Sequence, residues 1–307
     1  MKKVLLTGAS GFIGRQCISL LTERGYEVHA LSRRPLSSSF PNVRWHSCDL
    51  LLPGTPTTLC EELRPQYLLH TAWYAEPGKF WQSLENIEWV RSSLELASAF
   101  RRAGGTRLLA TGTCAEYESV ATECNEHSTP LLPSSLYGTS KHALERVLND
   151  WSRVGAMSSA WGRVFLLYGP YEHPSRLVAY VVRSLLHNEP ALCSEGSQIR
   201  DFLHVEDVAS ALVSLLDSDV QGPVNIASGV PVSVRTVLQQ IGERLGRTEL
   251  LRFGARQSFG EVPAILASVK RLSTEVGWKP KYNLSAGIEN TIEWWQREEA
   301  IEPASRA

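Results

Sequence analysis

Short apolar runs and helical stretches alternate regularly through the first two thirds of the chain, and this alternation constrains the fold most. Strands that alternate with helices need crossover connections, which build a parallel sheet covered on both faces. The pattern therefore predicts an α/β fold with a doubly wound parallel sheet. Strands are expected at 4–6, 26–32, 43–50, 67–73, 106–113, 158–169 and 222–228, with helices at 13–24, 56–65, 78–102, 138–153 and 205–218.

A glycine-rich loop, TGASGFIG, lies between the first expected strand and the first helix. Gly8, Gly11 and Gly14 permit a sharp turn, a close approach of backbone to a phosphate, and tight packing of the helix on the sheet. The start of the helix, at Phe12 and Ile13, offers N–H groups and a partial positive charge to a pyrophosphate. The loop therefore predicts a Rossmann-type dinucleotide site, with a plain turn as the alternative.

The alternation of strands and helices loosens after Gly169. We expect 1–169 together with 204–228 to form the dinucleotide-binding domain. The stretches 170–203 and 229–307 are then expected to form a smaller, discontinuous C-terminal lobe that binds the substrate.

Composition excludes several classes of partner. A net charge of -1 over 307 residues gives no basis for binding nucleic acid or an anionic membrane. No apolar run approaches the ~20 residues of a spanning helix. The six cysteines show no CxxC pair, which favours free thiols in a reducing cytosol over a disulfide framework or a zinc site. We expect a soluble, cytoplasmic protein without a bound metal.

The end of the second expected strand distinguishes between cofactors. NAD binders usually place a carboxylate there for the ribose 2′-hydroxyl, whereas this chain has Ser32, Arg33 and Arg34. Arginines can pair with a 2′-phosphate, so the residues favour NADP(H), with NAD(H) possible and a solvated basic turn as the alternative. Asp49 and Leu50 end the third strand and are expected to flank the adenine, although Asp49 could equally cap the next segment.

Tyr137 and Lys141 are four residues apart in an expected helix, so their side chains lie on one face. An ammonium near a phenol stabilises the phenolate and allows proton exchange near neutral pH. Thr113 ends an expected strand, and the carboxyl ends of parallel strands face the ligand crevice. Thr113, Tyr137 and Lys141 are therefore the candidate catalytic residues.

Further motifs follow one another in a characteristic order. They are TGASGFIG (7–14), Cys48-Asp49-Leu50, His70-Thr71-Ala72, Thr113 with Tyr117, Tyr137-x-x-x-Lys141, Arg163, Tyr168-Gly169-Pro170, GSQIRDFLHVEDVA (196–209), Asn225-Ile226-Ala227 and Gly277-Trp278-Lys279-Pro280. Together they resemble the extended short-chain dehydrogenase/reductase family, which comprises NAD(P)-dependent sugar-nucleotide epimerases, dehydratases and reductases. The resemblance covers nearly the whole chain.

The resemblance implies roles for individual residues. Tyr137 would be the general acid or base at the C4 oxygen of a sugar, and Thr113 would hydrogen-bond the same oxygen. Lys141 would hold the nicotinamide ribose and lower the pKa of the tyrosine. Tyr137 and Lys141 thus also belong to the implied cofactor-binding set, which is completed by Thr71, Ala72 and Thr111.

The residues after Thr113 depart from the family pattern. Family dehydratases have acidic residues where this chain has Cys114 and Ala115, and alanine cannot transfer a proton. Family 3,5-epimerase/reductases have a cysteine at the position of Ala115, so Cys114 is one place early and is expected to be a packed small residue. Glu116 stands where the family usually has an apolar residue, and it is expected either to touch the substrate or to be a solvated loop carboxylate.

Two arginines are candidates for binding the nucleotide sugar. Arg200 lies where the family binds the diphosphate, with a salt bridge to Asp201 or Asp207 as the alternative. Arg256 and Glu261 are candidates for contacting the base and ribose. These stretches look most like 4-keto-deoxysugar reductases, including enzymes of the abequose-synthase type.

Aromatic residues follow the fourth strand where smaller residues are usual in the family. Trp73, Tyr74 and Trp81 are expected at the mouth of the crevice, where they could stack on a sugar. They could equally be core or dimer-interface residues. Leu166 replaces an asparagine that contacts the substrate in many family members.

The sequence therefore predicts an enzyme that uses NADPH to reduce the C4 keto group of a nucleotide-linked deoxysugar. An NAD-dependent nucleotide-sugar 4-epimerase is the first alternative, since it needs the same three catalytic residues. A dinucleotide-binding sensor or scaffold without turnover is the alternative from another class. The resemblance also implies a homodimer formed by the helices at 78–102 and 138–153.

Overall fold

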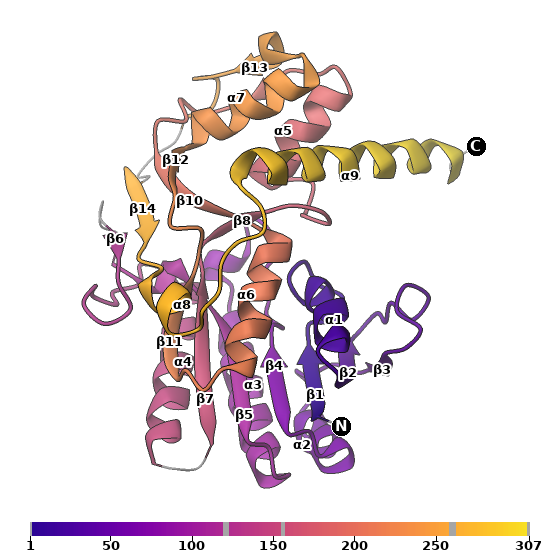
Figure 1. The fold of residues 1–307 in the computed structure, drawn as a ribbon, viewed down its shortest axis with the longest axis vertical. Helices are drawn as coiled ribbons and strands as arrows, with labels where there is room; N and C mark the ends of the chain where they lie inside the picture. Colours follow the sequence, from indigo (N-terminus) through magenta and orange to yellow (C-terminus); the bar gives the residue numbers. More distant parts are fainter. Residues whose placement is uncertain (1, 119–122, 155–156, 258–261, 306–307) are drawn as a thin grey trace.

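The computed structural model describes residues 2–118, 123–154, 157–257 and 262–305 (Figure 1). Its main sheet has seven parallel strands in the order β11-β7-β5-β4-β1-β2-β3. The strand order reverses between β1 and β4, and such a switch point opens a crevice at the carboxyl ends of the strands. The strands are β1 (Lys2–Thr7), β2 (Tyr26–Ser32), β3 (Arg44–Ser47), β4 (Tyr67–His70), β5 (Arg107–Thr113), β7 (Ser158–Val164) and β11 (Gly222–Ile226).

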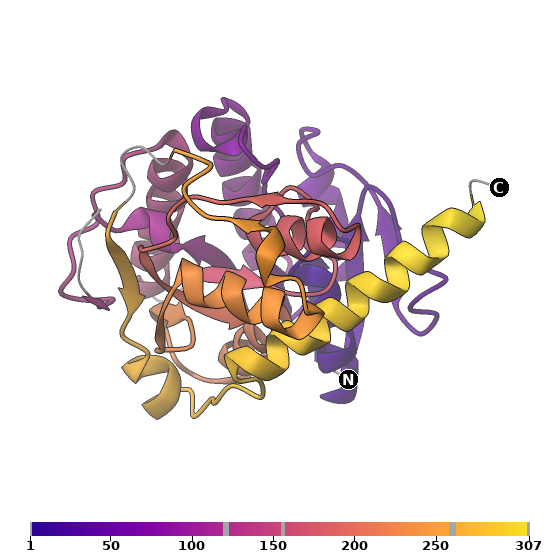
Figure 2. The same ribbon diagram turned by 90° about the horizontal axis from the view of Figure 1, so that it is seen from above.

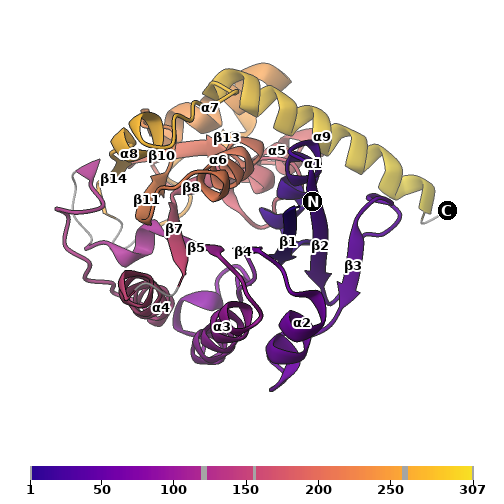
Figure 3. The same cartoon turned by 60° about the horizontal axis from the view of Figure 1, so that its bottom comes forward.

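Helices cover both faces of this sheet (Figure 3). On one face lie α2 (Thr55–Leu63), α3 (Glu85–Arg102) and α4 (Leu136–Arg153), and on the other lie α1 (Gly14–Glu23) and α6 (Val205–Asp217). Successive side chains of a strand point to opposite faces, so Leu5 joins the apolar cluster under α3 while Leu6 joins the cluster under α1 and α6. This two-sided burial explains why the strands are continuous apolar runs. The predicted doubly wound parallel sheet is confirmed.

A second, smaller lobe lies beyond the carboxyl ends of the main sheet (Figure 1). Its helices α5 (Leu177–Leu186), α7 (Val234–Leu245) and α9 (Leu284–Ser305) pack around one apolar cluster. Figure 2 shows α9 lying across this lobe, with its C-terminal end reaching past it. The remaining elements are β6 (Glu123–Cys124), β8 (Leu166–Tyr168), β9 (Ala191–Leu192), β10 (Ile199–His204), β12 (Pro231–Ser233), β13 (Leu251–Arg252), β14 (Ala264–Ala267), α8 (Lys270–Thr274) and three 3-10 turns, η1 (Phe80–Gln82), η2 (Cys114–Glu116) and η3 (Thr248–Leu250).

A stack of side chains joins the two lobes. The guanidinium of Arg15, on α1, lies 3.3 Å from the centre of the Tyr171 ring, and that ring packs against Trp294 of α9 at 4.6 Å between centroids. Arginine over an aromatic face gains both electrostatic and packing energy. None of the helices in the described ranges is long and apolar enough to span a membrane.

Two predicted elements differ from the structure. The strand expected at 158–169 is two strands, because β7 stays in the main sheet while β8 pairs with β10 in the other sheet. The helix expected from residue 78 begins only at Glu85, after the 3-10 turn η1. The buried side-chain amide of Asn86 stabilises this break by donating to the carbonyls of Phe80 and Ser83. Periodicity misses both breaks, since the apolar pattern continues across them.

Candidate active site

The glycine loop lies at the carboxyl end of β1, at the switch point of the main sheet. Gly8 has a φ of 68°, and a Cβ there would lie 2.8 Å from the backbone nitrogen of Ala72. A Cβ on Gly14 would lie 2.2 Å from the carbonyl oxygen of Gly8. Side chains at these two positions would therefore fill the space that the backbone turn occupies.

The loop leaves donors free at the start of α1. The N–H of Gly11 donates to the carbonyl of Gly8, whereas those of Phe12 and Ile13 have no acceptor among the described residues. Thr71 lies next to the glycine loop, and its hydroxyl donates to the carbonyl of Thr7 at 2.7 Å. Free N–H groups at a helix N-terminus suit a phosphate, so these residues fit the pyrophosphate of a dinucleotide.

The end of β2 presents the two arginines to solvent. Arg33 and Arg34 are exposed, and neither makes an ion pair with another described residue. The Ser32 hydroxyl holds this turn by accepting from the backbone N–H of Arg34. Asp49 caps its own turn through one oxygen, which accepts from Leu51 at 3.0 Å, while Leu50 is buried.

Thr113, Tyr137 and Lys141 are brought together by β5 and α4. The side chains of Thr113 and Tyr137 lie near enough to each other that Thr113 counteracts part of the rise in the Tyr137 pKa. The ammonium of Lys141 donates to the carbonyl of Thr111 at 2.7 Å and lies 3.9 Å from the centre of the Trp73 ring. The helix α4 can approach the Thr113 loop this closely because of Gly138, where a Cβ would lie 2.4 Å from a backbone oxygen of η2.

Burial shifts the pKa of both titratable members of this group in the direction of the neutral form. It raises the pKa of Tyr137, while the neighbouring Thr113 and the charge of Arg176 oppose the rise. It lowers the pKa of Lys141 to about 7, opposed by the charge of Glu116. A tyrosine with a raised pKa keeps its proton at neutral pH and can act as an acid.

Glu116 does not lie where the sequence led us to expect. Its side chain is fully buried, and one oxygen accepts from the Arg163 guanidinium at 2.7 Å. The other accepts from the backbone N–H of Thr113 at 2.8 Å and from the Trp161 indole at 3.0 Å. The predictions of a substrate contact or a solvated carboxylate are therefore wrong, because Arg163, 47 residues along the chain, pairs with it.

The aromatic residues after β4 divide into two groups. Trp81 is 46% exposed and meets Tyr137 edge-on, with 5.8 Å between ring centroids. Tyr74, which follows Trp73 in the sequence, is half-buried. Trp73 is a packing residue, because its indole donates to Asn86 and contacts the apolar cluster under α3.

The second lobe brings Arg200 and Arg176 toward the same region. Arg200 is buried and donates to the carbonyls of Ile199 and Val262 at 2.9 Å. Burial raises the pKa of the nearby Cys114 thiol to about 12, which the charge of Arg200 opposes only in part, and the Cys114 side chain packs against a buried cluster. Arg176 precedes α5 and was missed in the sequence, where it is one basic residue before an apolar run.

The alternative partners proposed for Arg200 are engaged elsewhere. Asp201 accepts from the backbone N–H groups of Ser228 and Gly229, and Asp207 accepts from two N–H groups that precede α9. Arg256 is exposed and lies over the Tyr180 ring, 4.9 Å from its centre. Glu261 lies outside the described residues, and Leu166 packs into the apolar cluster of the second lobe.

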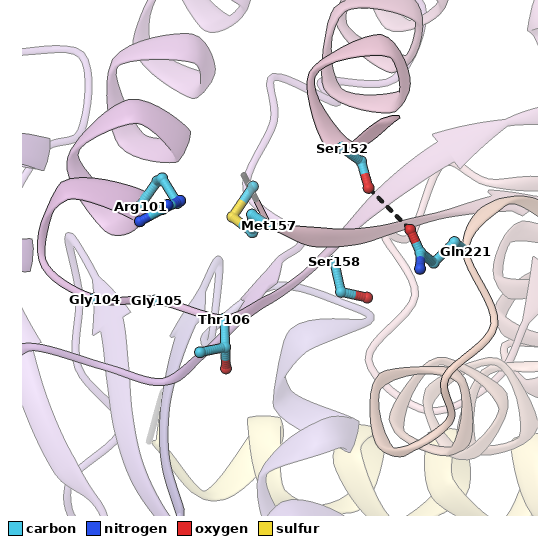
Figure 4. Close-up of a pocket in the computed structure, with 8 residues that line it drawn as sticks. All are labelled: Arg101, Gly104, Gly105, Thr106, Ser152, Met157, Ser158 and Gln221. Carbon is cyan, nitrogen blue, oxygen red and sulfur yellow. Dashed lines mark hydrogen bonds between the residues drawn. The ribbon is translucent and has the colours of Figure 1, made fainter. Parts of the chain in front are cut away.

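A separate pocket of about 420 Å³ lies at the opposite end of the main sheet (Figure 4). In Figure 4 the hydroxyl of Ser152 donates to Gln221, at 3.0 Å. Thr106 and Ser158 lie at the amino ends of β5 and β7, whereas Thr113 is at the carboxyl end of β5. The pocket is therefore remote from the candidate active site. Its lining residues are Arg101, Gly104, Gly105, Thr106, Ser152, Met157, Ser158 and Gln221.

A glycine loop lies at the switch point, a threonine ends β5, and a tyrosine and a lysine lie on the adjacent helix α4. This arrangement defines a Rossmann-fold enzyme of the short-chain dehydrogenase/reductase type. The sequence model of the NAD dependent epimerase/dehydratase family matches residues 4–227, so the chain belongs to that family. It is therefore an enzyme with oxidoreductase chemistry of the NAD-dependent type, related to those that act on sugar nucleotides.

Individual relatives differ in their reactions. The chain is 27% identical to the CDP-abequose synthase of Salmonella typhimurium, over 94% of this chain and 97% of that protein. It is 25% identical to a UDP-glucose 4-epimerase of Azospirillum brasilense, over 95% and 92% of the two chains. The solved structure of MoeE5 in complex with UDP-glucuronic acid and NAD is 28% identical, covers 96% and 99%, and superposes with a TM-score of 0.83.

Proposed function

We propose that this enzyme uses NADPH to reduce the C4 keto group of a nucleotide-linked deoxysugar. The observation that carries the proposal is that Thr113 lies beside Tyr137 while the two residues where the family's dehydratase acids stand are Cys114 and Ala115. The dehydratase acid position is Ala115, and the next carboxylate along the loop, Glu116, is fully buried on Arg163. The pair can serve a C4 oxygen, whereas neither Ala115 nor the paired carboxylate of Glu116 can remove a proton elsewhere on the sugar.

In the proposed reaction, Thr113 and Lys141 orient the substrate and the cofactor, and Tyr137 transfers the proton. Bound NADPH would supply the hydride. The hydroxyl of Thr113 hydrogen-bonds the C4 oxygen, and Tyr137 donates its phenolic proton to that oxygen as negative charge develops there. Because burial raises the pKa of Tyr137, the phenol carries its proton at neutral pH and is in the form that an acid needs. Lys141, beside the Thr111 carbonyl, is placed to hold the nicotinamide ribose.

Arg33 and Arg34 support NADP(H) as the cofactor. Both are exposed at the end of β2, where a 2′-phosphate would lie, and no carboxylate stands at the end of that strand. Changing both to alanine should raise the KM for NADPH about 10–100-fold, the loss expected for one or two charge-assisted hydrogen bonds. The KM for NADH should not change, and Arg102→Ala on α3 serves as the control. Equal KM values for both cofactors in the unaltered enzyme would refute the assignment.

The substrate side of the crevice is proposed to come from both lobes. Trp81 and Tyr74 would contact the sugar near Tyr137, and Arg200 with Arg256 would bind the nucleotide part in the lobe formed by 170–203 and 229–307. Buried Arg200 suits a diphosphate, because a guanidinium offers paired donors to phosphate oxygens.

We also propose a homodimer that pairs α3 and α4. Leu84, Ile87 and Val147 put exposed apolar surface on these helices or next to them, at 78%, 50% and 47% exposure. Ile87→Glu should then give a monomer in light scattering, while an unchanged molecular mass in that variant would contradict the pairing.

A substrate screen tests the proposed reaction. NADPH oxidation is measured against CDP-, dTDP-, GDP- and UDP-linked 4-keto sugars, and at least one should be reduced. Tyr137→Phe should lower kcat about 10²–10⁴-fold while NADPH binding is retained, since only the proton donor is lost. Wild-type turnover in Tyr137→Phe would exclude the proton-transfer role.

The main rival is an NAD-dependent nucleotide-sugar 4-epimerase, favoured by the similarity to the Azospirillum protein. It predicts NAD bound tightly after purification and interconversion of C4 epimers without net oxidation of NADPH. A protein that binds a dinucleotide without any turnover would indicate a sensor or scaffold instead.

A further inference from the structure

Glu116 closes a small turn directly after Thr113. In η2 the hydroxyl of Thr113 accepts from the backbone N–H of Ala115 at 3.2 Å, and the Glu116 carboxylate accepts from the N–H of Thr113 at 2.8 Å. Such a reciprocal capping box fixes both the backbone and the side chain of its first residue. The orientation of the Thr113 hydroxyl therefore depends on Glu116.

The carboxylate is itself held by β7, the neighbouring strand. Arg163 donates to one oxygen at 2.7 Å, and the Trp161 indole lies 3.0 and 3.1 Å from the two oxygens. Gly112 makes room for the group, because a Cβ there would lie 2.0 Å from the indole nitrogen and 2.5 Å from a Glu116 oxygen. Three positions of two strands are thus arranged around this one side chain.

The arrangement does more than fill space. An apolar side chain at 116 could pack in the same volume, but it would leave the N–H of Thr113 without its acceptor. It would also leave Arg163 with only the Tyr117 hydroxyl, at 3.2 Å, and the more distant Glu145 carboxylate, at 3.8 Å. A buried ion pair is costly to assemble, and it contributes geometry more than net stability. The contacts point to a positional role beside the reacting groups.

We propose that Glu116 is a positioning residue that aims the Thr113 hydroxyl at Tyr137 and at the sugar oxygen, a role that rests on the proposed function of that pair. Glu116 does not touch the substrate, because it is fully buried behind the turn. The negative charge of Glu116 also raises the pKa of Lys141, against the lowering caused by burial.

Glu116→Gln tests the role with little change in volume. A displacement of about 1 Å at a reacting group can cost about 10²-fold in rate. We expect kcat to fall about 10–100-fold, with less than about threefold change in the KM for the sugar nucleotide, and with NADPH binding retained. The unfolding temperature should fall, because the buried Arg163 guanidinium loses its charged partner, so activity is compared well below that temperature. The matched control is Glu145→Gln, which removes another buried carboxylate 3.8 Å from Arg163 but has no contact with Thr113. Its kcat should stay within about threefold of wild type.

A double variant separates positioning from general damage. In Thr113→Val the hydroxyl is gone, so adding Glu116→Gln should lower kcat no further if Glu116 acts through that hydroxyl. A further loss equal to that of the single variant, or a normal kcat in a folded Glu116→Gln, overturns the proposal. Absence of NADPH oxidation and of epimerisation in the wild type overturns the proposed function alone. A crystal structure of Glu116→Gln then decides the positioning role: a hydroxyl turned away from Tyr137 supports it, and an unmoved hydroxyl refutes it.

Discussion

Replacing Lys141 by methionine should stabilise the cofactor-free protein near neutral pH while it abolishes activity. The ammonium is almost fully buried, and burial lowers its pKa from the ordinary value of 10.5 to about 7. The unfolded chain binds this proton more tightly than the folded one between these two values, so wild-type stability rises with pH across that interval. Each pKa unit corresponds to about 1.4 kcal/mol, which gives a cost of about 4 kcal/mol at pH 7 and about 1 kcal/mol at pH 9.5.

Methionine has a similar shape and no charge, but it loses the hydrogen bond to Thr111, which contributes about 1 kcal/mol. The net gain of Lys141→Met should therefore be about 3 kcal/mol at pH 7 and close to zero at pH 9.5. Urea unfolding at the two pH values measures it. With a slope of about 3 kcal/mol/M, the midpoint should rise by about 1 M at pH 7.

Lys279→Met, at an exposed position, is the control and should change stability by less than about 0.5 kcal/mol at either pH. The reasoning is refuted if Lys141→Met is less stable than wild type at pH 7, or if its advantage persists undiminished at pH 9.5. Loss of turnover should accompany the gain, since active-site groups are commonly held at a cost in stability.

Four further variants test backbone geometry and buried charge. Gly14→Ala would place a Cβ 2.2 Å from the carbonyl oxygen of Gly8. It should lower the free energy of unfolding, measured by thermal unfolding, by about 1–3 kcal/mol, and weaken NADPH binding in a fluorescence titration about 10–100-fold. Arg64 ends α2 at a φ of 45°, so Arg64→Gly should raise the free energy of unfolding in urea by roughly 0.5–1 kcal/mol. Gly25 has a φ of 77°, so Gly25→Ala should lower the free energy of unfolding by a similar amount. Arg107→Met should destabilise by about 2–4 kcal/mol in the same assay, because it removes a buried donor from the carbonyls of Leu215, Leu216 and Val220, of which Leu215 keeps the Ser218 hydroxyl. An unchanged urea midpoint would contradict this.

The parts of the fold that depend on neighbouring residues could be predicted from the sequence. The consecutive apolar residues Leu5 and Leu6 predict a strand that is buried on both faces, and the spacing of Gly8 and Gly14 predicts a turn that only glycine allows. The four-residue spacing of Tyr137 and Lys141 places both on one face of α4. Local periodicity and backbone sterics act within a few residues, so these features are determined by the sequence alone.

The chemistry of the loop after Thr113 was decided by the tertiary structure. Nothing near Glu116 in the sequence indicates whether its carboxylate is solvated, and its partners Trp161 and Arg163 lie 45 and 47 residues away. The register of β5 against β7 sets Gly112 opposite Arg163, which brings the guanidinium to the buried carboxylate. Burial and long-range pairing fix the charge, orientation and accessibility of a side chain, and they exist only once the strands have paired.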